Sequence, residues 1–329
     1  MSQLKLIAGS GRSGTTWVLD ALAEANRLRP VFEPLHPHAS KIGQTYAHRV
    51  LAPDAFHPEL QEFFKDIAAG HRVRLWTRYR CQASWLLPRK TELSTIKGAA
   101  RLGRRWGKFL KEMPGLALMT SNADPLIKCI WSNLMLGWIT QQCNGRVVLL
   151  VRHPGAVIES ELRSDWNANF VLDRFRRDSM LHVLTAGRYQ ELLDRSLSPL
   201  EALAARWLIE NQWVIEHAPA NGVTVVSYER LRSSPEITWE QIRVALDLRL
   251  APDSSILAKP SQQSAREKSD AFGGAMGQPR WQRVLTSDQK GQIQRVLDQA
   301  SCDLYSMSDA EPRNDANRFA VARPAEVAR

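Results

Sequence analysis

A short segment near the amino terminus combines glycines with a cation and several hydroxyl side chains. Its glycines are Gly9, Gly11 and Gly14, and the polar side chains between and after them are Arg12, Ser13, Thr15 and Thr16. Glycines let the backbone turn tightly, so that its N–H groups can converge on an anion. A helix beginning near Thr15 would add unpaired amides and the positive end of its dipole. The segment therefore predicts a cradle for a phosphate-sized anion, against the alternative of an ordinary strand-to-helix turn without a ligand.

The residues around this segment narrow the choice of anion. The spacing from Gly9 to Gly14 fits the first part of the nucleotide-triphosphate loop GxxxxGK[ST], but Thr15 stands where that loop has its lysine. In phosphoryl transfer that lysine reaches the phosphates, and an aspartate after a second strand holds magnesium. The best candidate for the second strand, residues 146–151, is followed by Arg152. A cation in place of a metal ligand predicts a polyanion other than Mg-ATP.

Two motifs together resemble those of a known enzyme family. The run from Arg12 to Trp17 resembles the 5′-phosphosulfate loop of sulfotransferases, which use 3′-phosphoadenosine 5′-phosphosulfate (PAPS) as sulfuryl donor. Arg152-His153-Pro154 follows a candidate buried strand, and Ser160 comes eight residues after Arg152, as in the family's 3′-phosphate site. A guanidinium and a hydroxyl at this spacing can grip one phosphate together. The resemblance implies a donor site without a metal, formed by Gly11, Arg12, Ser13, Gly14, Thr15, Thr16, Trp17, Arg152 and Ser160.

Two weaker resemblances follow in the order expected for the family. The segment 226–231 (VSYERL) resembles a strand end where the family's tyrosine lies near the adenine, which implies that role for Tyr228; simple packing at a strand end is the alternative. Trp281 resembles the tryptophan after the family's late 3′-phosphate loop, for which Lys268, with Arg266 and Ser269, is the candidate. The Arg-Lys-Gly triplet of cytosolic members is not present in this form.

Transfer of a sulfuryl group to a hydroxyl requires a general base and groups that stabilise the charge on the leaving oxygen. Glu33 ends the candidate strand 30–33, and this position would bring it beside the loop of the first strand. We predict Glu33 as the base, with Lys128 and Arg12 stabilising the transition state. His36 is the alternative base, and a salt-bridging role is the alternative for Glu33.

The acceptor is expected to be a hydroxyl-bearing carbohydrate or glycolipid. The segment 32–35 (FEPL) resembles one in carbohydrate sulfotransferases, several of which use a glutamate as base. Aromatic side chains interleaved with arginines would suit stacking on sugar rings; these are Trp76, Tyr79, Trp85 and Trp106. A small alcohol, a phenol or a lipid as acceptor, and a kinase or NTPase activity, are the alternatives.

The elements that would position these residues alternate between strands and helices. Apolar runs predict strands at 4–8, 30–33, 126–130, 146–151 and 223–227, and helical spacing predicts helices from Thr15, from Pro154, and over 132–142, 200–217, 235–246 and 287–300. This alternation predicts the α/β class: a P-loop-like central parallel sheet flanked by helices. We expect one domain over residues 1–308, with a mostly helical insertion at about 38–124 covering the acceptor site, and a flexible tail at 309–329.

The composition of the chain limits the classes of protein to which it can belong. The chain has 329 residues, 44% of them hydrophobic, and a formal charge of +10 from 44 Lys and Arg against 34 Asp and Glu. Its apolar fraction is too high for disorder, and no apolar run reaches the length of a membrane span. The four cysteines lie far apart, and the first apolar run is too short for a signal peptide. We therefore expect a soluble cytoplasmic protein, without a structural metal, whose positive charge serves a small polyanion and not a nucleic acid.

Overall fold

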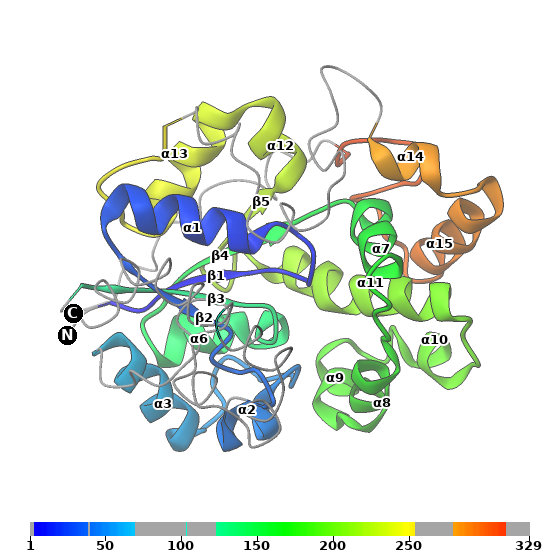
Figure 1. The fold of residues 1–329 in the computed structure, drawn as a ribbon. Coiled ribbons are helices and arrows are strands. Elements are labelled where there is room, and N and C mark those ends of the chain that lie inside the picture. The colour runs from blue at the N-terminus through cyan, green and yellow to red at the C-terminus, as the bar shows by residue number, and fades with distance from the viewer. Residues whose placement is uncertain (1–2, 39, 70–102, 104–122, 254–278, 314–329) are drawn as a thin grey trace.

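The fold is built on one parallel β-sheet. The computed structural model describes residues 3–38, 40–69, 103, 123–253 and 279–313 (Figure 1). Its five strands are β1 (Lys5–Ala8), β2 (Arg29–Phe32), β3 (Pro125–Cys129), β4 (Arg146–Val151) and β5 (Val223–Ser227). They lie in the order β2-β3-β1-β4-β5, and all four neighbouring pairs are parallel. The predicted α/β class and parallel sheet are confirmed.

Each strand is buried on both faces, because its alternate side chains enter two separate cores. On β4, Val147, Leu149 and Val151 belong to one apolar cluster, whereas Val148 and Leu150 belong to the other. Successive side chains of a strand point to opposite faces, so a continuous apolar run fits a sheet that is covered on both sides. This explains why the strands could be located from uninterrupted hydrophobic stretches.

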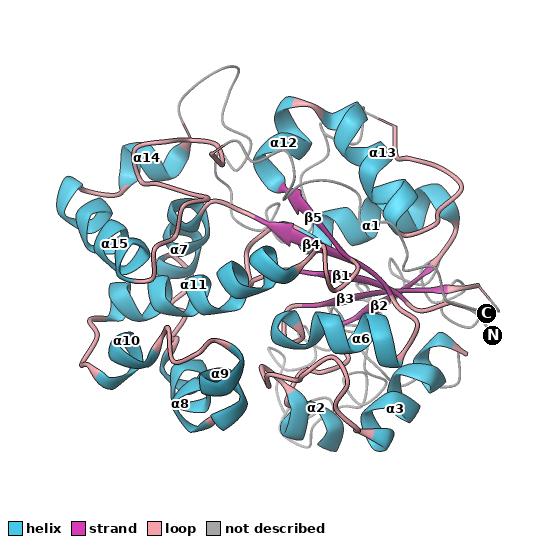
Figure 2. Cartoon of the chain, turned by 180° about the vertical axis from the view of Figure 1, so that it is seen from behind, coloured by secondary structure: helices cyan, strands magenta, loops and turns pink. Residues whose placement is uncertain are grey.

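Helices cover the two faces unequally (Figures 1 and 2). One face carries three helices: α1 (Thr15–Asn26), α12 (Tyr228–Ser233) and α13 (Pro235–Ala245). The larger core on the other face is lined by α2 (Lys41–Tyr46), α3 (Pro58–Ala68), the short 3-10 helix η2 (Asn133–Met135), α6 (Leu136–Gln142), α7 (Pro154–Leu162) and α11 (Pro199–His217). Beside α7 and α11 lie α8 (Asn169–Arg177), α9 (Ser179–Leu184), α10 (Gln190–Asp194), α14 (Arg280–Val284) and α15 (Ser287–Gln299).

Local signals fix where the long helices begin. The amino end of α11 has a capping box in which Ser198 and Glu201 satisfy each other's backbone N–H groups, followed by Pro199 at the first helical position. A second capping box, formed by Thr286 and Gln289, begins α15. These caps explain why both helices start within one residue of the positions that the sequence predicts.

The predicted elements agree with the structure to within one or two residues, with one exception. The helix expected over 132–142 begins as the 3-10 turn η2 and becomes α-helical only at Leu136. Of the predicted helical insertion, α2 and α3 are described, whereas Trp76, Tyr79, Trp85 and Trp106 lie outside the described residues. Among the helices of the described part of the chain, none combines the length and the apolar character that a membrane span requires.

Candidate functional site

The glycine-rich segment forms the connection from β1 to α1. Because β1 is the middle strand of the sheet, the segment lies between the carboxyl ends of β3 and β4, which flank it. Ligands of open parallel sheets bind at this edge. Two residues of the loop adopt left-handed conformations: Arg12 has φ 65°, and Gly14, which caps α1, has φ 94°. Ser13 donates its hydroxyl to the carbonyl of Ser10 at 2.6 Å, which closes the turn.

Aromatic rings press on the loop at two of its glycines. A Cβ atom at Gly14 would lie 2.7 Å from Cε2 of Tyr228, and one at Gly11 would lie 2.5 Å from Cζ3 of Trp166. Neither position can take a side chain without displacing a ring. The glycines therefore allow the backbone to approach its neighbours closely as well as to turn.

The structure brings together three of the predicted donor-site residues. Arg12 donates from Nε to the hydroxyl of Ser160 at 2.7 Å, and Arg152 donates from its guanidinium to the carbonyl of Arg12 at 2.9 Å. The guanidinium of Arg152 also lies 4.6 Å above the ring centre of Tyr228. The predicted arginine and serine thus meet through Arg12, and Arg12 itself occupies the hydroxyl that was expected to act with Arg152.

Trp281 has a supporting position. Its ring stacks on His153 with centroids 4.2 Å apart and an interplanar angle of 14°, and it is 2% exposed. Burial lowers the pKa of His153 to about 4, so the imidazole is neutral, and it accepts a hydrogen bond from the N–H of Gly155. Trp281 therefore braces the segment directly after Arg152. Lys268, with Arg266 and Ser269, lies outside the described residues.

Glu33 and Lys128 form a buried ion pair at the ends of β2 and β3. Lys128 Nζ contacts Glu33 Oε1, and the two side chains are 5% and 3% exposed. The other oxygen of Glu33 accepts from the N–H of Ile130 at 2.9 Å, and Lys128 Nζ lies 4.5 Å from the ring centre of Phe32. Glu33 has a φ of 48°, a strained value for a residue with a side chain. Residues held in strained backbone conformations cluster at functional sites.

The order of the strands bears on the position of Glu33. The sequence predicts that Glu33 lies beside the loop of the first strand, and in the sheet β3 lies between β2 and β1. Lys128, on this intervening strand, is in register with Ile7, two residues before Gly9. The order of the strands is a tertiary property, and the long segment between β2 and β3 leaves it open in the sequence. Lys128 therefore belongs to the strand nearer the loop.

His36, the alternative base, is engaged elsewhere. Its Nδ1 accepts from the N–H of His38 at 3.1 Å, and its ring meets the ring of Trp131 edge-on. Burial, followed by the charge of His38, lowers the pKa of His36. A neutral imidazole whose Nδ1 already accepts carries its proton on Nε2, so it is poorly prepared to receive another.

A buried polar network behind the loop was not anticipated. It consists of Ser10, His48, Asn133, Glu161, Arg206, Glu210 and Asn211. Arg206 forms a buried ion pair with Glu161, the residue after Ser160, and Glu210 contacts Nδ1 of His48 at 3.2 Å. Asn211 donates to the hydroxyl of Ser10 at 2.8 Å. The sequence contains a sign of this buried network, because the segment that forms α11 has apolar residues on nearly all of its faces with charged and amide residues between them.

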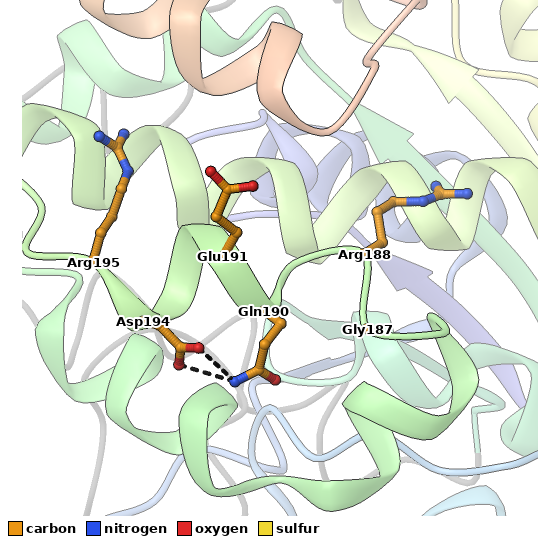
Figure 3. Close-up of a pocket in the computed structure, with 6 residues that line it drawn as sticks. All are labelled: Gly187, Arg188, Gln190, Glu191, Asp194 and Arg195. Carbon is orange, nitrogen blue, oxygen red and sulfur yellow. Dashed lines mark hydrogen bonds between the residues drawn. The ribbon is translucent and has the colours of Figure 1, made fainter.

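The surface hollow drawn in Figure 3 lies away from the loop. It has a volume of about 650 Å³ and is lined by Gly187, Arg188, Gln190, Glu191, Asp194 and Arg195. Its two arginines are paired with Glu216 and Glu201 of α11, and Gln190 donates to both oxygens of Asp194. These internal pairs leave little charge for a ligand, and none of the predicted site residues lies there.

Comparison with known proteins finds no family model and no curated protein that matches the chain. The solved structures that are similar to it include two sulfotransferases. The sulfotransferase domain from the curacin biosynthetic pathway is 16% identical, over 92% of this chain and 98% of that one, with a TM-score of 0.40. A sulfotransferase from Alicyclobacillus acidocaldarius is 12% identical, over 94% of this chain and 100% of that one, with a TM-score of 0.37. Scores this low carry no weight for function, so the residues themselves must support any proposal.

Proposed function

We propose that the protein is a sulfotransferase that moves a sulfuryl group from PAPS to an acceptor hydroxyl and releases adenosine 3′,5′-bisphosphate. The observation that carries this proposal is the joining of Arg12, Ser160 and Arg152 at the carboxyl ends of β1 and β4. A cationic cluster suits a ligand with phosphate groups at both ends of a nucleoside. Arg152 follows the strand where a nucleotide triphosphatase has its magnesium-binding acid, so the cluster favours a donor that binds without a metal.

The roles of the donor-site residues follow from their positions. The backbone amides of Gly14 to Thr16, the hydroxyls of Thr15 and Thr16, and the dipole of α1 would hold the phosphosulfate end. Arg152 and Ser160 would hold the 3′-phosphate, with Arg12 between the two ends. Tyr228, which lies against both Gly14 and Arg152, would form one wall for the adenine. Trp17 and Trp281, both buried, would act by packing.

Glu33 and Lys128 would perform the proton transfer and stabilise the moving charge. As the acceptor oxygen bonds to sulfur and the bond from sulfur to the bridging oxygen breaks, Glu33 takes the acceptor's proton. Both oxygens of Glu33 are occupied in the structure, one by Lys128 and one by the N–H of Ile130. Movement of Lys128 from Glu33 to the sulfuryl oxygens would free the carboxylate and stabilise the transition state in one step.

The acceptor that we propose is a hydroxyl of a carbohydrate or glycolipid, as the segment from Phe32 to Leu35 implies. A small alcohol, a phenol or a lipid is the alternative. We also propose that the protein acts in the cytoplasm. Incubation of acceptor pools with radiolabelled PAPS would distinguish the acceptor classes by the compound that takes the label.

Calorimetry with two nucleotides tests the donor. Adenosine 3′,5′-bisphosphate is expected to bind in the presence of a chelator, and Mg-ATP is not; the opposite result would favour a kinase or NTPase. Arg12→Ala and Arg152→Ala should each raise the dissociation constant roughly tenfold or more, since a hydrogen bond from a charged group contributes about 1.5–3 kcal/mol. Arg188→Ala, at the distant hollow, is the matched control and should bind like the wild type. Equal affinity in all three variants would refute the assignment.

A further inference from the structure

One face of α11 contacts both segments that bring Arg12, Arg152 and Ser160 together in the proposed donor site. Residues 206, 207, 210 and 211 are spaced so that they share this face. Arg206 pairs with Glu161, next to Ser160, and Trp207 donates from its indole N–H to the carbonyl of Arg152 at 3.0 Å. Asn211 donates to the hydroxyl of Ser10 in the loop. Two segments far apart in the sequence, the loop and the stretch from Arg152 to Glu161, are thus attached to one rigid helix.

The loop is held from α11 at two consecutive residues. The N–H of Gly9 donates to Oδ1 of Asn133 at 3.1 Å, and the amide of Asn133 donates in turn to the carbonyl of Glu210. Ser10 is held directly by Asn211, and its carbonyl accepts both the hydroxyl and the N–H of Ser13. The orientation of Ser10 therefore sets that of Ser13 and of the turn that leads to Gly14, Thr15 and Thr16, whose amides would line the proposed phosphosulfate site.

These contacts are buried. Asn211 is 0% exposed and Ser10 is 1% exposed, so removing either partner takes a hydrogen bond from a buried polar group. A loop that binds an anion through its backbone amides must hold them in place before the ligand arrives, because donors that reorient on binding lose affinity. On the basis of the proposed function, we propose that Asn211 is a positioning residue that fixes the anion-binding conformation of the loop.

Neighbouring amides on α11 provide a matched experiment. Asn211→Ala removes the bond to the loop, whereas Gln212→Ala removes a similarly buried amide whose bond goes to the carbonyl of Ala300, away from the site. Both variants should lose comparable thermal stability. Only Asn211→Ala is expected to weaken the binding of adenosine 3′,5′-bisphosphate, by roughly tenfold, when calorimetry is run well below both melting temperatures.

A second variant keeps the test valid should Asn211→Ala not fold. Trp207→Phe retains an aromatic ring in the core but removes the N–H that bonds to the carbonyl of Arg152. It should also weaken nucleotide binding, with a smaller loss of stability. If the wild type binds the nucleotide and all three variants match it, the positioning role of α11 is refuted while the proposed function stands. If the wild type itself fails to bind, the proposed function falls, and this inference with it.

Discussion

Glu210 and His48, in the network behind the loop, allow a quantitative prediction. Their side chains are 2% and 7% exposed, and Oε1 of Glu210 lies 3.2 Å from Nδ1 of His48. Burial is the largest cause of both pKa shifts: it raises the pKa of Glu210 to about 7 and lowers the pKa of His48 to about 3. Arg206 and Glu161 also act on Glu210, and Arg206 and Arg174 act on His48. Between pH 4.5 and 6.5 the folded pair is therefore neutral, with the proton on Glu210.

The two shifts have opposite effects on stability. A raised carboxyl pKa contributes stability that is lost as the pH rises from about 4.5 to about 7. A lowered histidine pKa contributes stability that is lost as the pH falls from 6.5 to about 3. Where the two ranges overlap, the unfolded chain carries the proton on His48 and the folded chain carries it on Glu210. The folded and unfolded chains then bind the same number of protons at these two residues, so the pair makes the free energy of unfolding change very little with pH.

Replacing one residue of the pair should reveal how the other residue makes the free energy of unfolding depend on pH. Glu210→Gln keeps the size and hydrogen-bonding capacity of the side chain but does not titrate, so only His48 remains. The free energy of unfolding should then fall by up to about 1.4 kcal/mol for each pH unit below 6.5, or roughly 2–3 kcal/mol by pH 4.5. His48→Gln leaves only Glu210 to titrate, so it should give the opposite pH dependence: the free energy of unfolding should fall as the pH rises from about 4.5 to about 7.

Urea unfolding at half-unit steps from pH 4.5 to 8 would measure these slopes. The difference between each variant and the wild type removes the contribution of the other titrating groups. The expected result is two difference curves of opposite sign within the overlapping range. Parallel curves for all three proteins would show that the pair does not hold its proton on Glu210 and would refute the neutral assignment.

Two further predictions concern the proposed site. Gly14→Ala should abolish nucleotide binding, because its Cβ would meet the ring of Tyr228 and because Gly14 has a φ of 94°. Gly187→Ala, with a φ of 74° in the distant hollow, is the control for a glycine of positive φ outside the site and should leave binding intact. Glu33→Gln should bind the nucleotide but lose turnover in a radiolabelled-PAPS assay, and it should cost about 3–5 kcal/mol in urea unfolding by leaving Lys128 buried without its partner. Recovery of stability, but not of activity, in Glu33→Gln/Lys128→Met would separate the two effects, whereas full activity in Glu33→Gln would move the role of base elsewhere.

Elements that depend on local sequence could be predicted, and their mutual arrangement could not. The strands appear as apolar runs because both of their faces are buried, as Val147 to Val151 show. The loop appears because its backbone geometry requires glycine at positions such as Gly14. The insertion of β3 between β1 and β2 depends on how the chain packs after residue 34, which no local pattern records.

The same limit applies to the cationic cluster. Arg152 and Ser160 belong to one region of the chain, because helix α7 begins soon after β4. Spacing alone could not show that Arg12, in another loop, would bond to Ser160. Likewise, the family resemblance placed Trp281 near the nucleotide, whereas only the packing of α14 against α7 shows that its ring stacks on His153.

The polar residues of α11 show how a buried helix can be recognised from its sequence. Its apolar residues recur at helical spacing, and in an ordinary surface helix Arg206, Glu210 and Asn211 would face solvent. All three are at most 3% exposed, because α11 is enclosed by η2, α7, α8 and α15. A helix with apolar residues on nearly every face is buried, and its polar residues must then find partners inside the protein. Such residues mark the polar surface that the helix supports, which here is the loop and strand end of the proposed donor site.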